Sequence, residues 1–317
     1  MKKMMLGALC MSFLVACEQQ EFTENETESG NELRVEAEIS STGLLPSRTV
    51  TTPEGNVSFA ENDQIGFYTP ATAESGSWTF NGMNWTSTEL YTWPDKTETY
   101  DFCAYYPFTV AETRDAITMP DLSTQNGLST QLSKYDFLVA RSKAGYATHK
   151  GIVSFTGEEA FKHVYALLAV TLKANAETDG SVLKGISLKA TDIVTNHTYH
   201  FGKTASEDGM TSTAAKHELT LTELDGSIDT KGYKQVFILN PLTASENVEI
   251  TITYSRGGKD YTASTKIAAK NIQAGNLNRL NMLLRKAGLE VQGNTVEDWN
   301  EADLGDISVE ESPTVQP

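Results

Sequence analysis

The feature that most constrains this chain is the recurrence of short segments in which apolar and polar residues alternate. A period of two places one face of a β-strand in a core and the other in solvent. Paired turn residues separate many of these segments, as expected of hairpins that need positive φ. Few stretches are helical, so the pattern predicts an all-β fold of the sandwich type. The alternating sets are Val35, Ala37, Ile39; Ile65, Phe67; Tyr100, Phe102, Ala104, Tyr106; Val248, Ile250, Ile252, Tyr254; and Tyr261, Ala263, Thr265, Ile267, and the turn pairs are Asn81-Gly82, Asp179-Gly180, Asp208-Gly209, Asp225-Gly226 and Gly257-Gly258.

Two segments, residues 161–172 and 276–286, also have a good helix-forming composition. Both alternate as well, through Ala166, Leu168, Val170 and Leu172 in the first and Leu280, Met282 and Leu284 in the second. In an all-β context this combination favours strands whose two faces are both covered.

The number of candidate strands indicates how the chain is divided. More than a dozen strands over about 265 residues fit two sandwiches of about seven strands better than one. The expected domains are residues 34–157 and 158–299, with the boundary near Gly157-Glu158-Glu159. No repeat of short period is visible, which excludes solenoids and propellers.

The N-terminus resembles the signal of a bacterial lipoprotein. Residues 1–16 combine Lys2 and Lys3 with an apolar run too short to span a bilayer, and Ala16 precedes Cys17 as in a lipobox. We therefore expect cleavage between Ala16 and Cys17 and diacylation of the Cys17 thiol; the alternative is an ordinary secretory signal with an incidental cysteine. Residues 17–33 are acidic and cannot build a core, so they are interpreted as a tether, and they resemble export signals for surface display.

Charge and cysteine content narrow the possible partners. The chain carries a net charge of −17, and removing Lys2 and Lys3 with the signal would bring it to −19. Nucleic acid is thereby excluded as a partner, because phosphate binding needs clustered Lys and Arg. Cys103 would be left with no partner for a disulfide in the mature chain, and its strand-like context predicts a buried, unreactive thiol.

Motifs of catalysis and metal binding are missing from the sequence. It contains no nucleophile elbow, phosphate loop, zinc-protease helix or EF-hand spacing. His197 and His200 are three residues apart, so on a strand they face opposite ways and cannot share a metal ion. Adjacent Glu158 and Glu159 do not define a glycosidase pair. We expect a protein that is not an enzyme and has no metal ion or cofactor.

Aromatic residues are concentrated between Trp78 and Phe108, where ten of the 28 in the chain occur. Such a cluster is typical of a sandwich core, in which each ring buries a large area. The alternative is a platform on which sugars stack, using Trp78, Trp85 and Trp93. That alternative describes a lipid-anchored glycan-binding module on the cell surface.

At these residues the chain resembles the fimbrillin family, the lipoprotein pilins of type V pili. Tyr91-Thr92-Trp93-Pro94, followed by residues 101–107 (DFCAYYP), is similar to the family's Y-x-W-P and D-F-x-A-Y-Y-P segments. Further similar segments follow in the family's order from Arg34 to Trp299: residues 62–68 (NDQIGFY), 135–140 (YDFLVA), 161–163 (FKH) and 296–299 (VEDW).

The resemblance implies two tandem transthyretin-like sandwiches and export to the outer membrane and fimbrium. It also implies that an arginine-specific protease removes an N-terminal strand, and that a strand from another pilus subunit fills the groove by β-augmentation. The matching positions here are Leu33 to Ser40 for the strand, within residues 34–48, and Arg48-Thr49 for the cleavage. Thr49 departs from the family's usual alanine, and Arg48 as an ordinary loop cation stays an alternative. Cleavage at Arg34 would leave the strand attached.

Residues 300–317 form an acidic tail with a brief apolar pattern at Leu304, Ile307 and Val309. A donor strand needs sustained alternation of apolar residues. The tail therefore favours a tip or minor subunit slightly over a stalk subunit, with an anchor subunit also open. The ligand for adhesion cannot be read from these residues.

Overall fold

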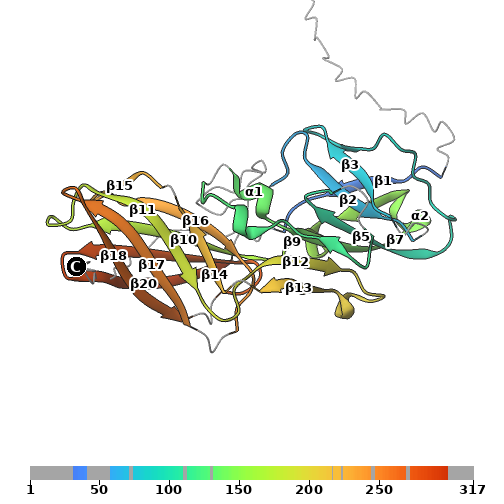
Figure 1. Ribbon diagram of the computed structural model, residues 1–317. Coiled ribbons are helices and arrows are strands. Elements are labelled where there is room, and N and C mark those ends of the chain that lie inside the picture. Colours follow the sequence, from blue (N-terminus) through green and yellow to red (C-terminus); the bar gives the residue numbers. More distant parts are fainter. Residues whose placement is uncertain are drawn as a thin grey trace, which may run out of the picture. The chain divides into compact units, whose positions relative to one another are not determined.

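The structure is a computed structural model that describes residues 31–40, 58–70, 74–109, 113–128, 131–215, 217–222, 224–243, 247–268 and 272–298. Most regular structure in these residues is β-strand, arranged in five sheets (Figure 1). The predicted all-β class is confirmed, and every alternating segment identified in the sequence contributes to a strand.

The largest sheet has six strands in the order β4-β3-β2-β5-β7-β9. All its pairs are antiparallel, and β5 lies at its centre between β2 and β7. The aromatic-rich segment of the sequence supplies β3, β4 and β5. The strands are β2 (Gln64–Tyr68), β3 (Gly76–Phe80), β4 (Trp85–Thr86), β5 (Thr99–Tyr106), β7 (Leu138–Gly145) and β9 (Lys162–His163).

Two smaller sheets accompany it. In one, β1 (Arg34–Ala37) pairs in parallel with β8 (Ile152–Phe155), which joins the N-terminal segment to a strand more than a hundred residues later. In the other, the hairpin of β12 (Val194–His200) and β13 (Gly209–Ala215) pairs through β12 with β6 (Ile117–Thr118).

The remaining two sheets contain most of the later strands. One has the order β16-β10-β19-β20, in which β10 and β19 are parallel. The other has the order β14-β11-β17-β18, with β15 also paired to β11. The strands are β10 (Ala166–Ala174), β11 (Ser181–Lys189), β14 (Glu218–Leu221), β15 (Gly226–Ile228), β16 (Tyr233–Leu239), β17 (Asn247–Arg256), β18 (Lys259–Ala268), β19 (Asn276–Arg285) and β20 (Gly288–Asp298).

Helices in the described residues are single turns. They are η1 (Leu122–Thr124), α1 (Leu132–Tyr135), α2 (Tyr146–His149), η3 (Gly157–Glu159) and η4 (Ala205–Glu207). In this part of the chain, no helix has the length and apolar character needed to cross a membrane.

Buried apolar residues form two clusters, which we call the first core and the second core. The first core contains β1, β2, β5, β7 and β8 side chains, and the second contains those of β11, β17 and β18. Strand β10 contributes to both: Leu167 belongs to the first core and its neighbour Leu168 to the second. The two segments of ambiguous composition are thus strands, as predicted, and on β10 both faces are covered because each faces a different core.

The division into domains at residues 157–158 stays a prediction. Residues 157–159 form the short helix η3 rather than a linker without structure. Tyr199 and Phe201, from the later half of the chain, pack in the first core, and their strand β12 pairs with β6. Residues from 158 onward therefore contribute to both cores.

The expected turn glycines divide into two groups. Gly82, Gly180, Gly257 and Gly258 have positive φ, as the sequence predicts. Gly209 and Gly226 do not, and instead each begins a strand. At Gly226 a Cβ would lie 1.9 Å from the Tyr233 ring, so there glycine is required by a close approach rather than by backbone conformation.

Candidate functional site

Strand β1 and the groove that holds it form the candidate functional site. Along residues 33–39, Leu33, Val35 and Ile39 are buried, with 2–5% of each exposed, whereas Arg34, Glu36 and Glu38 are exposed. On the partner strand, Val153 and Phe155 are fully buried. Strand β1 and the residues that flank it therefore fill the groove with alternate apolar side chains and leave their charged face to solvent.

Backbone hydrogen bonds hold β1 and the residues that flank it from more than one side. Arg34 N–H donates to Gly151 O (3.0 Å) and Glu38 N–H to Phe155 O (3.0 Å), on the β8 side. On another side, Leu33 N–H donates to Tyr91 O (2.9 Å), and the N–H of Trp93 donates to Asn31 O (2.7 Å). An extended segment held in this way is what β-augmentation produces, although here the strand comes from the same chain.

Two charged side chains, of Arg34 at the start of β1 and of Glu38 directly after β1, bond to the backbone on either side of β8. The Arg34 guanidinium donates to Lys150 O at 2.7 Å, just before β8 begins. The Glu38 carboxylate accepts from Gly157 N–H at 2.6 Å, just after β8 ends. Glu36 lies between them on the same exposed face.

Tryptophans of the aromatic cluster lie in the wall of this groove. The Trp85 indole N–H donates to Ala37 O of β1 (3.4 Å), and the Trp93 indole N–H donates to Gly151 O (3.1 Å). Trp78 packs against Phe67 and Tyr91. All three tryptophans are at least 93% buried, which favours the core role over the sugar-stacking platform, since stacking needs an exposed ring face.

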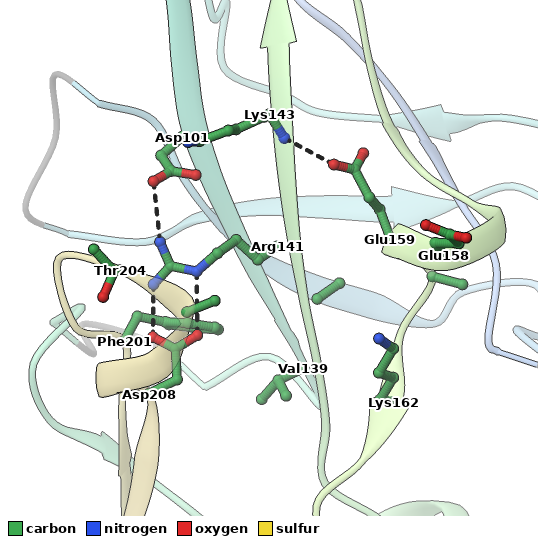
Figure 2. Close-up of a pocket in the computed structure, with 13 residues that line it drawn as sticks. Asp101, Val139, Arg141, Lys143, Glu158, Glu159, Lys162, Phe201, Thr204 and Asp208 are labelled. Atoms are coloured by element: carbon green, nitrogen blue, oxygen red, sulfur yellow. Dashed lines mark hydrogen bonds and ion pairs between the residues drawn. The ribbon is translucent and has the colours of Figure 1, made fainter.

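A separate pocket of about 430 Å³ lies between β7, η3 and the segment that joins β12 to β13 (Figure 2). Its rim carries Lys143, Lys162, Glu158 and Glu159. The Glu159 carboxylate accepts from Ser142 Oγ (2.8 Å) and from Lys143 N–H (3.1 Å), so it ties η3 to β7. This charge-mixed pocket was not predicted from the sequence.

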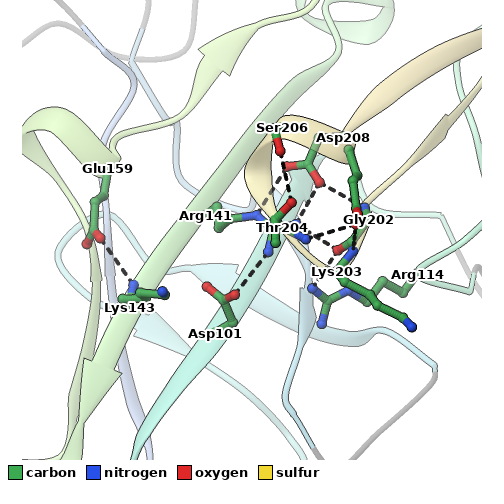
Figure 3. Close-up of polar contacts among 11 residues, drawn as sticks. Asp101, Arg114, Arg141, Lys143, Glu159, Gly202, Lys203, Thr204, Ser206 and Asp208 are labelled. Atoms are coloured by element: carbon green, nitrogen blue, oxygen red, sulfur yellow. Dashed lines mark hydrogen bonds and ion pairs between the residues drawn. The ribbon is translucent and has the colours of Figure 1, made fainter.

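Arg141 lies between Asp101 and Asp208 at this pocket (Figure 2). It donates to both carboxylate oxygens of Asp208, at 2.6 and 3.1 Å, and to Asp101 at 3.3 Å. Arg141 and Arg114 also both donate to Gly202 O (Figure 3). Burial alone would lower the pKa of Arg141, but the bond to Asp208 and the nearby carboxylates raise it overall. Through these bonds the Arg141 guanidinium holds the β12–β13 segment, so the guanidinium is not free to bind an anionic ligand.

Other residues singled out in the sequence have the predicted environments. Cys103 is a free, fully buried thiol, and burial raises its pKa to about 11. On β12, His197 is buried whereas His200 is only half-buried, consistent with opposite faces of the strand. Among the described residues, no three His, Cys, Asp or Glu side chains gather to hold a metal ion.

Four predicted site residues lie outside the described residues: Ala16 and Cys17 at the lipobox, and Arg48 and Thr49 at the cleavage site. Cleavage and lipidation at these positions stay predictions, as does the role of the acidic tail 300–317. Sequence reasoning considered Arg34 only as a cleavage candidate and did not identify Glu38. The sequence feature that could have identified both residues is their position at the two ends of an alternating segment.

The fold and the groove define a class: an all-β protein in which an N-terminal strand completes a core and is held by buried apolar side chains and backbone hydrogen bonds. The family model described as fimbrillin-like matches residues 47–299. The chain therefore belongs to the fimbrillin-like family, as the sequence motifs predicted. No curated protein matches the chain.

Two solved structures share the fold, and a third is similar to the chain at a lower TM-score. A protein of Bacteroides uniformis proposed to act in cell adhesion is 20% identical, with a TM-score of 0.55 over 86% of this chain and 99% of its own. One of Bacteroides ovatus, with the same proposed role, is 14% identical, with a TM-score of 0.55 over 87% and 100%. A fimbrial assembly protein of Parabacteroides distasonis is 11% identical, with a TM-score of 0.42 over 88% and 98%.

Proposed function

We propose that this protein is a surface-exposed pilus subunit that assembles by strand exchange at the β1 groove and supports adhesion. The observation that carries the proposal is that β1 fills an apolar groove yet pairs in its sheet with one strand, β8. Membership of the fimbrillin-like family and the adhesion role proposed for two proteins of the same fold support it.

Loss of β1 would make the groove receptive to another strand. Burial of each side chain such as Leu33, Val35 or Ile39 contributes about 1.5–3 kcal/mol. Without β1, the groove would expose apolar partners including Val153 and Phe155, together with unpaired backbone groups of β8. A strand from another subunit with the same alternation would cover both, which is the physical basis of the proposed assembly.

Release of β1 would require a cut between β1 and β2, and Arg48-Thr49 is the proposed position. The same cut would separate the folded part from Cys17, where we propose that lipid anchors the chain in the outer membrane. An anchored precursor would thereby become a subunit competent to polymerise. The roles of tip, minor and stalk subunit are all compatible with this scheme.

Treatment of the mature chain with an arginine-specific protease tests the scheme. We expect a new N-terminus at Thr49, followed by SDS-resistant ladders or by capture of a partner strand. The variant Arg48→Lys keeps the charge but removes the site, so it should stay uncut and monomeric, as should Arg48→Ala. A chain that stays intact at Arg48, or one that is cut there but never forms ladders, would contradict the stalk role.

The anchor has a separate test. Cells producing the wild-type chain should yield a protein that carries a diacylglycerol mass on Cys17 and partitions into detergent. The Cys17→Ala variant should lose both properties. Detergent partitioning that persists in the variant would show that the anchor lies elsewhere.

A further inference from the structure

The β1 groove has a problem of register that its apolar alternation cannot solve. A shift of β1 by one residue would turn its charged side chains inward, which is costly. A shift by two residues keeps the apolar side chains inward, because Leu33, Val35, Ala37 and Ile39 occupy every second position. Something else must distinguish the observed register from registers two residues away.

The two charged contacts at the ends of β1 provide this distinction. Arg34 donates to a carbonyl, Lys150 O, at one end of β8, and Glu38 accepts from an amide, Gly157 N–H, at the other. The two contact points have opposite polarity, so a donor side chain is required at the first and an acceptor at the second. Charge-assisted hydrogen bonds of this kind are stronger than neutral ones.

Shifted registers would place the wrong side chain at the first contact point. A shift by two residues in one direction puts Glu32 beside Lys150 O, and a shift in the other direction puts Glu36 there. Either carboxylate would face a carbonyl oxygen with no proton to share. Arg34 is the only cation among residues 31–40, so only the observed register satisfies both contact points.

We propose that the groove selects strands by charge as well as by apolar alternation. The selected strand carries a cationic donor and, four residues later, a carboxylate on its solvent face, in the order that Arg34 and Glu38 show. This inference rests on the proposed function, because it names the strand that would replace β1. Lys150 O and Gly157 N–H are the two backbone groups of the groove that would recognise these charged side chains.

The test uses the full mature chain with a site-specific protease sequence inserted within residues 41–57, so that it does not depend on cleavage at Arg48. The nicked chain is incubated with a fluorescent peptide of residues 31–40, and retained label is measured by anisotropy. The matched test peptide carries Arg34→Glu together with Glu38→Arg, which preserves composition, net charge and apolar pattern. The control peptide carries Glu36→Ala.

We expect the swapped peptide to bind about tenfold more weakly than the wild-type peptide, and the Glu36→Ala peptide to bind within about twofold of it. Equal binding of the swapped and wild-type peptides would overturn the proposal. A nicked chain that takes up none of the peptides would instead count against strand exchange itself.

A second measurement tests the inference without strand exchange. In the unnicked chain, the same swap should speed hydrogen exchange at the backbone amides of residues 34 and 38, which bond to Gly151 O and Phe155 O. The Glu36→Ala chain should protect these amides as the wild type does. Equal protection in the swapped and wild-type chains would overturn the role of the two charges even if no peptide binds.

Discussion

Asn278 has a buried side-chain amide near the start of β19 that forms no hydrogen bond to the described residues. It is 1% exposed, and both its Oδ1 and Nδ2 atoms lack partners. Burial of an unpaired amide is unfavourable, so Asn278→Leu should raise the free energy of unfolding by about 1–2 kcal/mol. Denaturant titration at neutral pH measures this change.

Asn240 provides the matched comparison because it is buried yet fully bonded. Its Oδ1 accepts from Val194 N–H, and its Nδ2 donates to Asp192 O and Pro241 O. Asn240→Leu should lower the free energy of unfolding by about 2–4 kcal/mol, since it leaves these buried groups unpaired. Similar destabilisation by both substitutions would show that Asn278 is bonded in solution.

His197 should make stability depend on pH. Its ring is 2% exposed, with Nδ1 3.2 Å from the Tyr165 hydroxyl, and burial lowers its pKa from 6.5 to about 4. Between pH 6.5 and pH 4 the unfolded chain takes up a proton that the folded chain does not, so about 3 kcal/mol of stability is lost as the pH falls through this window.

Unfolding measured across this window checks the effect. The His197→Gln variant should lose about 3 kcal/mol less than the wild type between pH 6.5 and pH 4. His200→Gln, on the other face of the same strand, should keep the wild-type loss because His197 is still present. An unchanged acid loss in His197→Gln would rule out His197 as its source.

Strand β16 illustrates how an edge is protected by a side chain. Gln125 is buried, and its amide donates to Ile238 O (3.0 Å) and accepts from Ile238 N–H (2.9 Å), as a neighbouring strand would. Gln125→Ala should therefore cost about 2–3 kcal/mol, because it leaves both backbone groups buried and unpaired. Gln131→Ala, at an exposed position, should change stability by less than about 0.5 kcal/mol. A similarly small effect of Gln125→Ala would mean that water replaces the amide at this edge.

Local pattern was sufficient to predict several strands but not their partners. Alternation identified β5, β17 and β18, and it resolved β10 and β19 against their helix-forming composition. The parallel pairing of β1 with β8 has no local signal, since the two strands lie more than a hundred residues apart. The register that places Arg34 and Glu38 at opposite ends of β8 follows only from that pairing.

The same limit applies to contacts that join distant parts of the chain. Family motifs indicated an N-terminal strand, and the aromatic cluster indicated the first core. Arg141, by contrast, bonds to Asp208, 67 residues later, in a hairpin that sequence alone would assign to the second sandwich. A pairing between single charged residues leaves no periodic trace, so neither this ion pair nor the pocket beside it could be predicted.

The sharing of β10 between both cores predicts how the whole molecule unfolds. Two independent sandwiches would melt in two transitions, but here Leu167 and Leu168 are successive residues of one strand that face different cores. Calorimetry should therefore show one transition, with equal calorimetric and van't Hoff enthalpies. Leu167→Ala and Leu168→Ala should each lower that transition as a whole, at a cost of about 2–5 kcal/mol. Two resolved transitions, of which each substitution shifts only one, would show instead that the cores unfold independently and that β10 does not couple them.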